Sequence, residues 1–179
     1  MSSNASPHIV LPDYNTEDSL IYGIGNIGRQ DDGLGWAFID WLERQSVFPR
    51  AELMRHYQLH LEDADLISRK KQVLFVDATQ STDVQSFQFE AVTPKMDFSF
   101  TSHAISAPAI LATCKTCFDY MPKVHFLSIR GYAWALSQGM TTRAWHNLYA
   151  ASEFIWQQKN QQTSTLCGES HEQTRYRQR

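Results

Sequence analysis

Cysteine is scarce in this chain, and so are long apolar runs and any surplus of positive charge. The 179 residues include three cysteines, an odd number that argues against a disulfide framework and favours a reducing compartment. A formal net charge of −3 argues against the broad basic surface that nucleic-acid binding requires. No apolar run approaches the roughly 20 residues that span a bilayer, and residues 1–6 lack the apolar core of a secretory signal. We therefore expect a cytoplasmic protein that binds neither nucleic acid nor membrane.

The composition is that of an ordinary globular domain, with 42% hydrophobic and 20% charged residues. Apolar patterns predict strands at 19–25, 73–76 and 124–129, an edge strand at 87–92, and helices that begin near residues 34, 106 and 141. The alternation predicts an α/β fold, a three-layer α/β/α sandwich around a mostly parallel twisted sheet of about five strands. We expect a flexible N-terminal arm over 1–18, one α/β domain over 19–158, and a disordered, Gln-, Ser- and Thr-rich tail over 159–179.

The first predicted strand runs into glycines at Gly-x-Gly-x-x-Gly spacing, from Gly23 to Gly28. Alone, this spacing is a weak dinucleotide-binding fingerprint. Two carboxylates, Asp31 and Asp32, stand directly before the helix and would repel a diphosphate, although Arg29 offsets part of that repulsion. The helix also begins too late for the tight turn of that fold. A dinucleotide-binding protein is therefore the less favoured interpretation.

Three residues are candidates for a metal site at the carboxyl edge of the sheet. One aspartate of the 31–32 pair suffices to cap the helix, which frees the other to face the crevice where α/β proteins bind ligands. Asp77 closes the apolar strand 73–76 and is either a ligand or a carboxylate held by neighbouring backbone amides. His103 precedes the helix at residue 106 and is either a ligand or base, or simply solvated. Two carboxylates and an imidazole suit a divalent transition metal such as nickel, zinc or iron.

Other candidates are better explained by packing. Ser106 is placed to cap a helix with Pro108 in its first turn. Cys114 and Cys117 fall inside that helix with no second Cys-x-x-Cys pair, so we interpret them as structural. No Gly-x-Ser-x-Gly elbow is present, which argues against a serine hydrolase of that type.

Several motifs together resemble those of a known family. Gly23-Ile24-Gly25-Asn26, followed by Asp31-Asp32-Gly33-Leu34-Gly35, resembles the N-terminal signature of the hydrogenase maturation proteases. The run Val73–Ala78 and the segment Ser102–Pro108 are similar to the second and third signatures, and Gln58-Leu59 also matches part of the family. The resemblance covers residues 19–157, and the motifs keep the family's order.

The resemblance implies an α/β/α fold and a peptidase. Members of the family remove a short C-terminal extension from the large-subunit precursor of a [NiFe] hydrogenase. Asp32, Asp77 and His103 correspond to the family's metal-contacting acid, acid and histidine, which leaves Asp31 as the expected capping residue of the helix. The implied cofactor is nickel that the substrate supplies, rather than a permanently bound ion, and no nucleotide is implied. Metal polarisation, a carboxylate base, or both would assist attack by water.

Two positions depart from the family pattern. Gln30 stands where the family commonly has glycine, and Gly28 stands where it commonly has a bulky apolar residue. These departures bear on the loop backbone and on substrate specificity. The alternative to an enzyme is a non-catalytic maturation factor that binds the precursor or its metal through the same residues.

Overall fold

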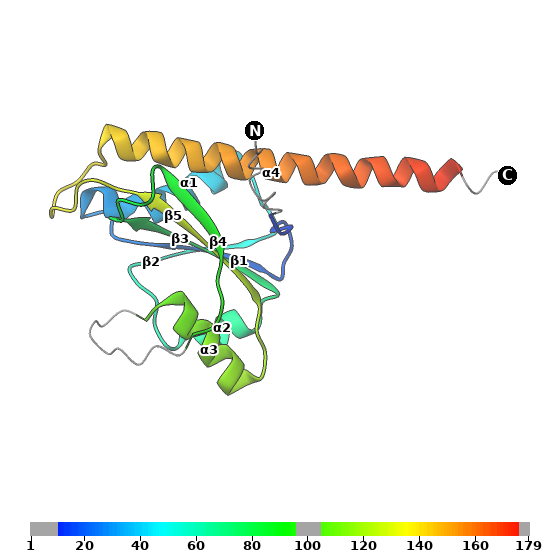
Figure 1. Cartoon of the computed structure of the whole chain (residues 1–179), viewed down its shortest axis with the longest axis horizontal. Helices are drawn as coiled ribbons and strands as arrows, with labels where there is room; N and C mark the ends of the chain where they lie inside the picture. Colours follow the sequence, from blue (N-terminus) through cyan, green and yellow to red (C-terminus); the bar gives the residue numbers. More distant parts are fainter. Residues whose placement is uncertain (1–10, 96–104, 176–179) are drawn as a thin grey trace, which may run out of the picture.

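Five strands form one sheet in the order β2-β1-β3-β5-β4 (Figure 1). The computed structural model describes residues 11–95 and 105–175, with side chains as far as residue 161. The strands are β1 (Ser19–Ile24), β2 (Glu52–His56), β3 (Gln72–Thr79), β4 (Phe87–Ala91) and β5 (Lys123–Arg130). The first four strands in spatial order run parallel, and β4 pairs antiparallel with β5 at the edge. The predicted mostly parallel sheet is thereby confirmed.

Helices cover both faces of this sheet. They are α1 (Leu34–Gln45), α2 (Asp63–Ser68), α3 (Ala107–Phe118) and α4 (Thr142–Arg175), with a 3₁₀ turn, η1 (Gln30–Gly33), before α1. Helices α1 and α4 lie on one face and α2 and α3 on the other (Figure 1). The three-layer α/β/α arrangement predicted from the sequence is confirmed.

The position of β3 at the centre of the sheet explains its unbroken apolar sequence. Leu74 and Val76 point into the core under α1 and α4, whereas Val73 and Phe75 point into the core over α2 and α3. Successive side chains of a strand face opposite sides, so a strand covered on both faces must be apolar at every position.

Residues 11–18 pack against the body of the domain, which differs from the flexible arm expected over 1–18. Leu11 and Tyr14 are fully buried in the core under α1 and α4. The Tyr14 hydroxyl lies 3.0 Å from Nδ1 of His125 on β5. Isolated apolar residues in a polar stretch carry no periodic signal, so the sequence did not predict their burial.

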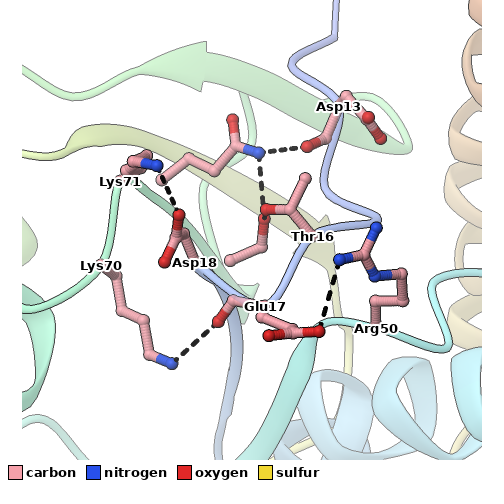
Figure 2. A network of polar contacts seen from close by, with 9 residues as sticks. Asp13, Thr16, Glu17, Asp18, Arg50, Lys70 and Lys71 are labelled. Atoms are coloured by element: carbon pink, nitrogen blue, oxygen red, sulfur yellow. Dashed lines mark hydrogen bonds and ion pairs between the residues drawn. The ribbon is translucent and has the colours of Figure 1, made fainter.

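Ion pairs fasten the same segment to the amino ends of the strands (Figure 2). Asp18 pairs with Lys71 at 2.6 Å, and Glu17 pairs with Arg50 at 3.3 Å. The pairs lie largely at the surface, where each contributes little to stability. Their effect is to fix the path of the chain into β1.

Helix α4 continues through Arg175, whereas the composition of the sequence predicts a disordered tail from residue 159. In Figure 1 its orange and red half runs beyond the sheet. A helix already nucleated on the core adds each residue at little cost, and glutamine and lysine are good helix formers. No helix among the described residues is long and apolar enough to cross a membrane.

Candidate active site

The turn that carries Asp32 is held against the end of β1 by backbone contacts. The N–H of Asn26 donates a hydrogen bond to the Asp32 carbonyl at 3.1 Å. Gly25 has a φ of 135°, and a Cβ there would lie 1.9 Å from the Asp32 carbonyl oxygen. Only glycine fits such a position. The second glycine of the motif therefore serves this turn rather than a pyrophosphate.

Gly35 brings Asp32 and Asp77 to the same place. A Cβ on Gly35 would lie 2.1 Å from the carbonyl oxygen of Ile24 and 2.6 Å from that of Val76. Helix α1 therefore begins in direct backbone contact with the last residue of β1 and with β3 just before Asp77. Because Val76 precedes Asp77, this close approach places the η1 turn beside the second acid.

Asp77 stands near the carboxyl end of β3, opposite Ser128 of β5. Its Oδ1 accepts a hydrogen bond from the backbone N–H of Ala78 at 2.7 Å, so the interpretation of a carboxylate held by a neighbouring amide is correct for one oxygen. Among the described residues, Oδ2 accepts no hydrogen bond. One side of this carboxylate is thus available to a ligand.

Asp32 and Asp77 line one open cleft of about 400 Å³ at the carboxyl edge of the sheet. The remaining lining residues are Ile24, Gly25, Tyr57, Gln58, Leu59, Ile105, Ser106, Ala107, Pro108 and Phe126. The sequence motifs had singled out Gln58, Leu59 and the start of α3, but not Tyr57 or Phe126. Tyr57 is 63% exposed and packs on Trp36, with the ring centroids 5.3 Å apart. The cleft pairs two acids with an otherwise mostly apolar wall.

Burial raises the pKa of both carboxyls in the cleft, those of Asp77 and Asp32. It raises the pKa of the Asp77 carboxyl to about 7; the Ala78 hydrogen bond opposes the rise, and the negative charge of Asp32 adds to it. Burial also raises the pKa of Asp32, against the lowering effects of Arg29 and of the Asn26 amide. The two carboxyls are close enough to interact electrostatically, and perturbed acids in a cleft are typical of functional sites.

The position of Asp31 directly before the helix suggested that it caps α1. The structure shows that it does not. No side-chain hydrogen bond caps either η1 or α1. The Asp31 carboxylate is fully buried and accepts four hydrogen bonds, from the N–H groups of Tyr132, Ala133 and Thr141 and from the Thr141 hydroxyl. These partners follow β5, about a hundred residues along the chain, so no local pattern indicated them. Asp31 fastens the η1 turn to the β5–α4 loop and leaves Asp32 alone to face the cleft.

Gln30 adopts a left-handed backbone conformation, with φ at 51°. Glycine adopts this conformation without strain, which gives a physical reason for the glycine common in the family at this position. In this chain Gln30 is tied down instead. Its Oε1 accepts a hydrogen bond from Ala135 at 3.0 Å, and its N–H donates to the Ser137 carbonyl at 2.9 Å.

His103, the third candidate ligand, lies outside the described residues. Within the part of the chain that is described, no three His, Cys, Asp or Glu side chains converge as a metal site. The cleft therefore presents two of the three candidate ligands.

The cap at the start of α3 and the packing of Cys114 agree with what the sequence predicts. Ser106 is the N-cap residue and accepts from the Ala109 N–H, with Pro108 in the first turn. Cys114 is buried and donates its S–H to the Ala64 carbonyl at 3.4 Å, whereas Cys117 is exposed. Packing of Cys114 between α3 and α2 confirms its structural role.

Comparison with known proteins identifies similar solved structures only. No family model and no curated protein matches the sequence. The structure superposes on the [NiFe] hydrogenase maturation protease HycI from Thermococcus kodakarensis with a TM-score of 0.64, at 16% identity, over 84% of this chain and 96% of that one. For the maturating endopeptidase HybD from E. coli the TM-score is 0.59, at 17% identity, over 76% and 88% of the two chains. For HybD from T. kodakarensis it is 0.58, at 16% identity, over 76% and 95%.

These superpositions cover most of both chains in each pair, at identities that establish a shared architecture and no more. The matched proteins are those to whose family the sequence motifs point. The chain therefore has the fold of the [NiFe] hydrogenase maturation proteases.

Proposed function

We propose that this protein is an endopeptidase that removes the C-terminal extension of a nickel-loaded [NiFe] hydrogenase large-subunit precursor. The observation that carries the proposal is the meeting of Asp32 and Asp77 in one open cleft of this fold. They come from separate elements, η1 and β3. In α/β proteins, ligands bind outside the carboxyl ends of the strands, which is where this cleft opens.

In this proposal nickel is part of the substrate. Asp32 and Asp77 supply carboxylate oxygens to it, and His103, two residues before the cleft-lining Ile105, supplies an imidazole nitrogen. Imidazole and carboxylate both bind divalent first-row metals. A protein that recognises its substrate through the metal rejects an unloaded precursor, because the contact is then missing.

The chemistry follows from the same two acids. Nickel on the substrate polarises the scissile carbonyl or its attacking water. A carboxyl whose pKa lies at about 7, as for Asp77 in the free protein, is suited to exchange protons near neutral pH. The apolar wall of the cleft packs against the peptide on either side of the scissile bond.

Incubation of the purified protein with nickel-loaded precursor tests this function. We expect the intact mass of the precursor to fall by the mass of the extension, and the nickel-free precursor to stay uncut. A non-catalytic maturation factor would bind the loaded precursor and leave its mass unchanged, which would overturn the proposal of an enzyme.

A further inference from the structure

Tyr57 stands at the end of the acidic cleft that lies nearest β2. It is the first residue after that strand, and it lines the cleft together with Asp32 and Asp77. Most of its side chain is exposed, and it takes part in neither hydrophobic core of the described residues. Packing of the domain therefore leaves this ring free to contact a ligand in the cleft.

The Tyr57 ring is nevertheless held in place. It packs on the ring of Trp36, whose Nε1–H donates a hydrogen bond to the carbonyl of His56 at 3.0 Å. The same carbonyl accepts from the N–H of Gly25 at 3.0 Å. Tyr57 thus stands on an indole that is anchored to the sheet. A side chain that is already ordered loses little conformational entropy when it binds.

The cleft runs across the ends of four strands. In the spatial order β2-β1-β3-β5, its lining residues include Tyr57 after β2, Asp32 in the turn after β1, Asp77 in β3 and Phe126 in β5. Neighbouring strands lie about 4.8 Å apart, so the three spacings from β2 to β5 give the cleft a length of about 14 Å. The two acids therefore lie between two aromatic residues.

This geometry sets the distance between Tyr57 and the acids. The register of β2, β1 and β3 places Tyr57 one residue beyond the row of Asp77. Two strand spacings separate them, which is about 10 Å. An extended peptide rises about 3.3 Å per residue, so a substrate cut beside Asp77 meets Tyr57 about three residues from the scissile bond.

We propose that Tyr57 is a specificity-determining residue that binds an apolar side chain of the precursor within about three residues of the scissile bond. This inference rests on the proposed function, in which the precursor is cut beside the nickel that Asp32 and Asp77 contact. An apolar side chain fits because Ile24 and Leu59, beside Tyr57 in the cleft, are themselves buried and apolar. Tyrosine is also among the residues that contribute most to binding in interfaces.

Steady-state cleavage of nickel-loaded precursor by the full chain tests this role. Because Tyr57 lies away from the acids, it contacts the peptide equally in the bound precursor and in the transition state, and such a contact changes KM rather than kcat. Tyr57→Ser should raise KM at least about tenfold and leave kcat within about twofold of wild type. Tyr57→Phe keeps the ring and should keep both constants within about twofold.

The matched control is Tyr149→Ser on α4, which changes a tyrosine that is 69% exposed and does not line the cleft. It should leave KM and kcat unchanged, with circular dichroism showing that all variants fold. On the substrate side, serine replaces each residue within about three positions of the scissile bond in turn. One apolar position should raise the KM of the wild type about tenfold and that of Tyr57→Ser less than about twofold, because the contact is already lost.

The failure of this inference differs from the failure of the proposed function. Cleavage by the wild type with an unchanged KM for Tyr57→Ser, or with a loss in kcat alone, would overturn the role of Tyr57 and leave the endopeptidase standing. A scan in which only a charged substrate residue depends on Tyr57 would also overturn it. Absence of cleavage by the wild type would overturn the proposed function, and this inference with it.

Discussion

Asp31 and Thr141 form a two-point contact across the molecule. The Thr141 N–H donates to Oδ1 of Asp31 at 2.7 Å, and its hydroxyl donates to Oδ2 at 2.9 Å. The same hydroxyl accepts from the Ala144 N–H at 3.2 Å and so caps α4. This contact fixes the turn that presents Asp32 against the loop that starts α4.

Replacing Asp31 by asparagine should destabilise the fold. The amide group would point toward N–H donors that the carboxylate now accepts, and hydrogen bonds to charged groups are the stronger ones. We expect the free energy of unfolding in urea to fall by about 2–4 kcal/mol. The exposed Asp83→Asn is the control and should change it by less than about 0.5 kcal/mol. Equal stability of the two variants would show that the contact is incidental.

Gln30 balances backbone strain against hydrogen bonds of its own. The left-handed conformation costs a non-glycine residue about 1 kcal/mol, and the Ala135 hydrogen bond returns a similar amount. Gln30→Ala keeps the strain and loses the bond, whereas Gln30→Gly loses both. We expect Gln30→Gly to be more stable than Gln30→Ala by about 0.5–1 kcal/mol in chemical denaturation. The opposite order would contradict a strained turn.

The glycines around the cleft should differ sharply in their tolerance to alanine. A methyl group on Gly35 meets the carbonyl oxygens of Ile24 and Val76 on strand backbones, which cannot move aside cheaply. A methyl group on Gly28 meets only the side-chain oxygen of Asn26, at 3.1 Å. We expect Gly35→Ala to lose about 3 kcal/mol or more and Gly28→Ala less than about 1 kcal/mol, by thermal and urea unfolding. Comparable losses would show that α1 does not rest on the strand ends.

The buried Asp77 carboxyl should lower the free energy of unfolding as the pH becomes alkaline. The pKa of Asp77 is raised from 3.8 to about 7 in the folded protein. Between these values the folded state binds the proton and the unfolded state does not, so this contribution to stability is full below pH 3.8 and is lost as the pH rises through 7. Asp77→Asn removes this loss. Its free energy of unfolding at pH 8 should exceed that of the wild type by about 1 kcal/mol or more. If the pH dependence of unfolding were the same in the variant and the wild type, a carboxyl destabilised by burial would be refuted.

How far the sequence predicted this structure depends on the range of each interaction. The apolar run before Asp77 and the Ser106 cap are local patterns, and both were predicted correctly. Asp31 was misassigned to the helix because its partners follow β5. Tyr14 and His125 meet through the tertiary fold alone, and the continuation of α4 has no apolar periodicity to reveal it.

The candidate site likewise has features that local sequence patterns reveal and features that only the tertiary fold creates. Each acid could be found from its position after an apolar strand or before a helix. Their meeting in one cleft depends on the contact of Gly35 with the backbones of β1 and β3, which becomes visible only in three dimensions. Tyr57 was missed because one exposed aromatic residue in a loop carries no pattern.

Cleavage rates of nickel-loaded precursor by the aspartate variants test the central claim most directly. Intact-mass measurements over time should show Asp32→Asn and Asp77→Asn at least about a hundredfold slower than wild type. The exposed Asp83→Asn should cleave at the wild-type rate. Trimming by both cleft variants at the wild-type rate would contradict the assignment of Asp32 and Asp77 to the site of a maturation endopeptidase.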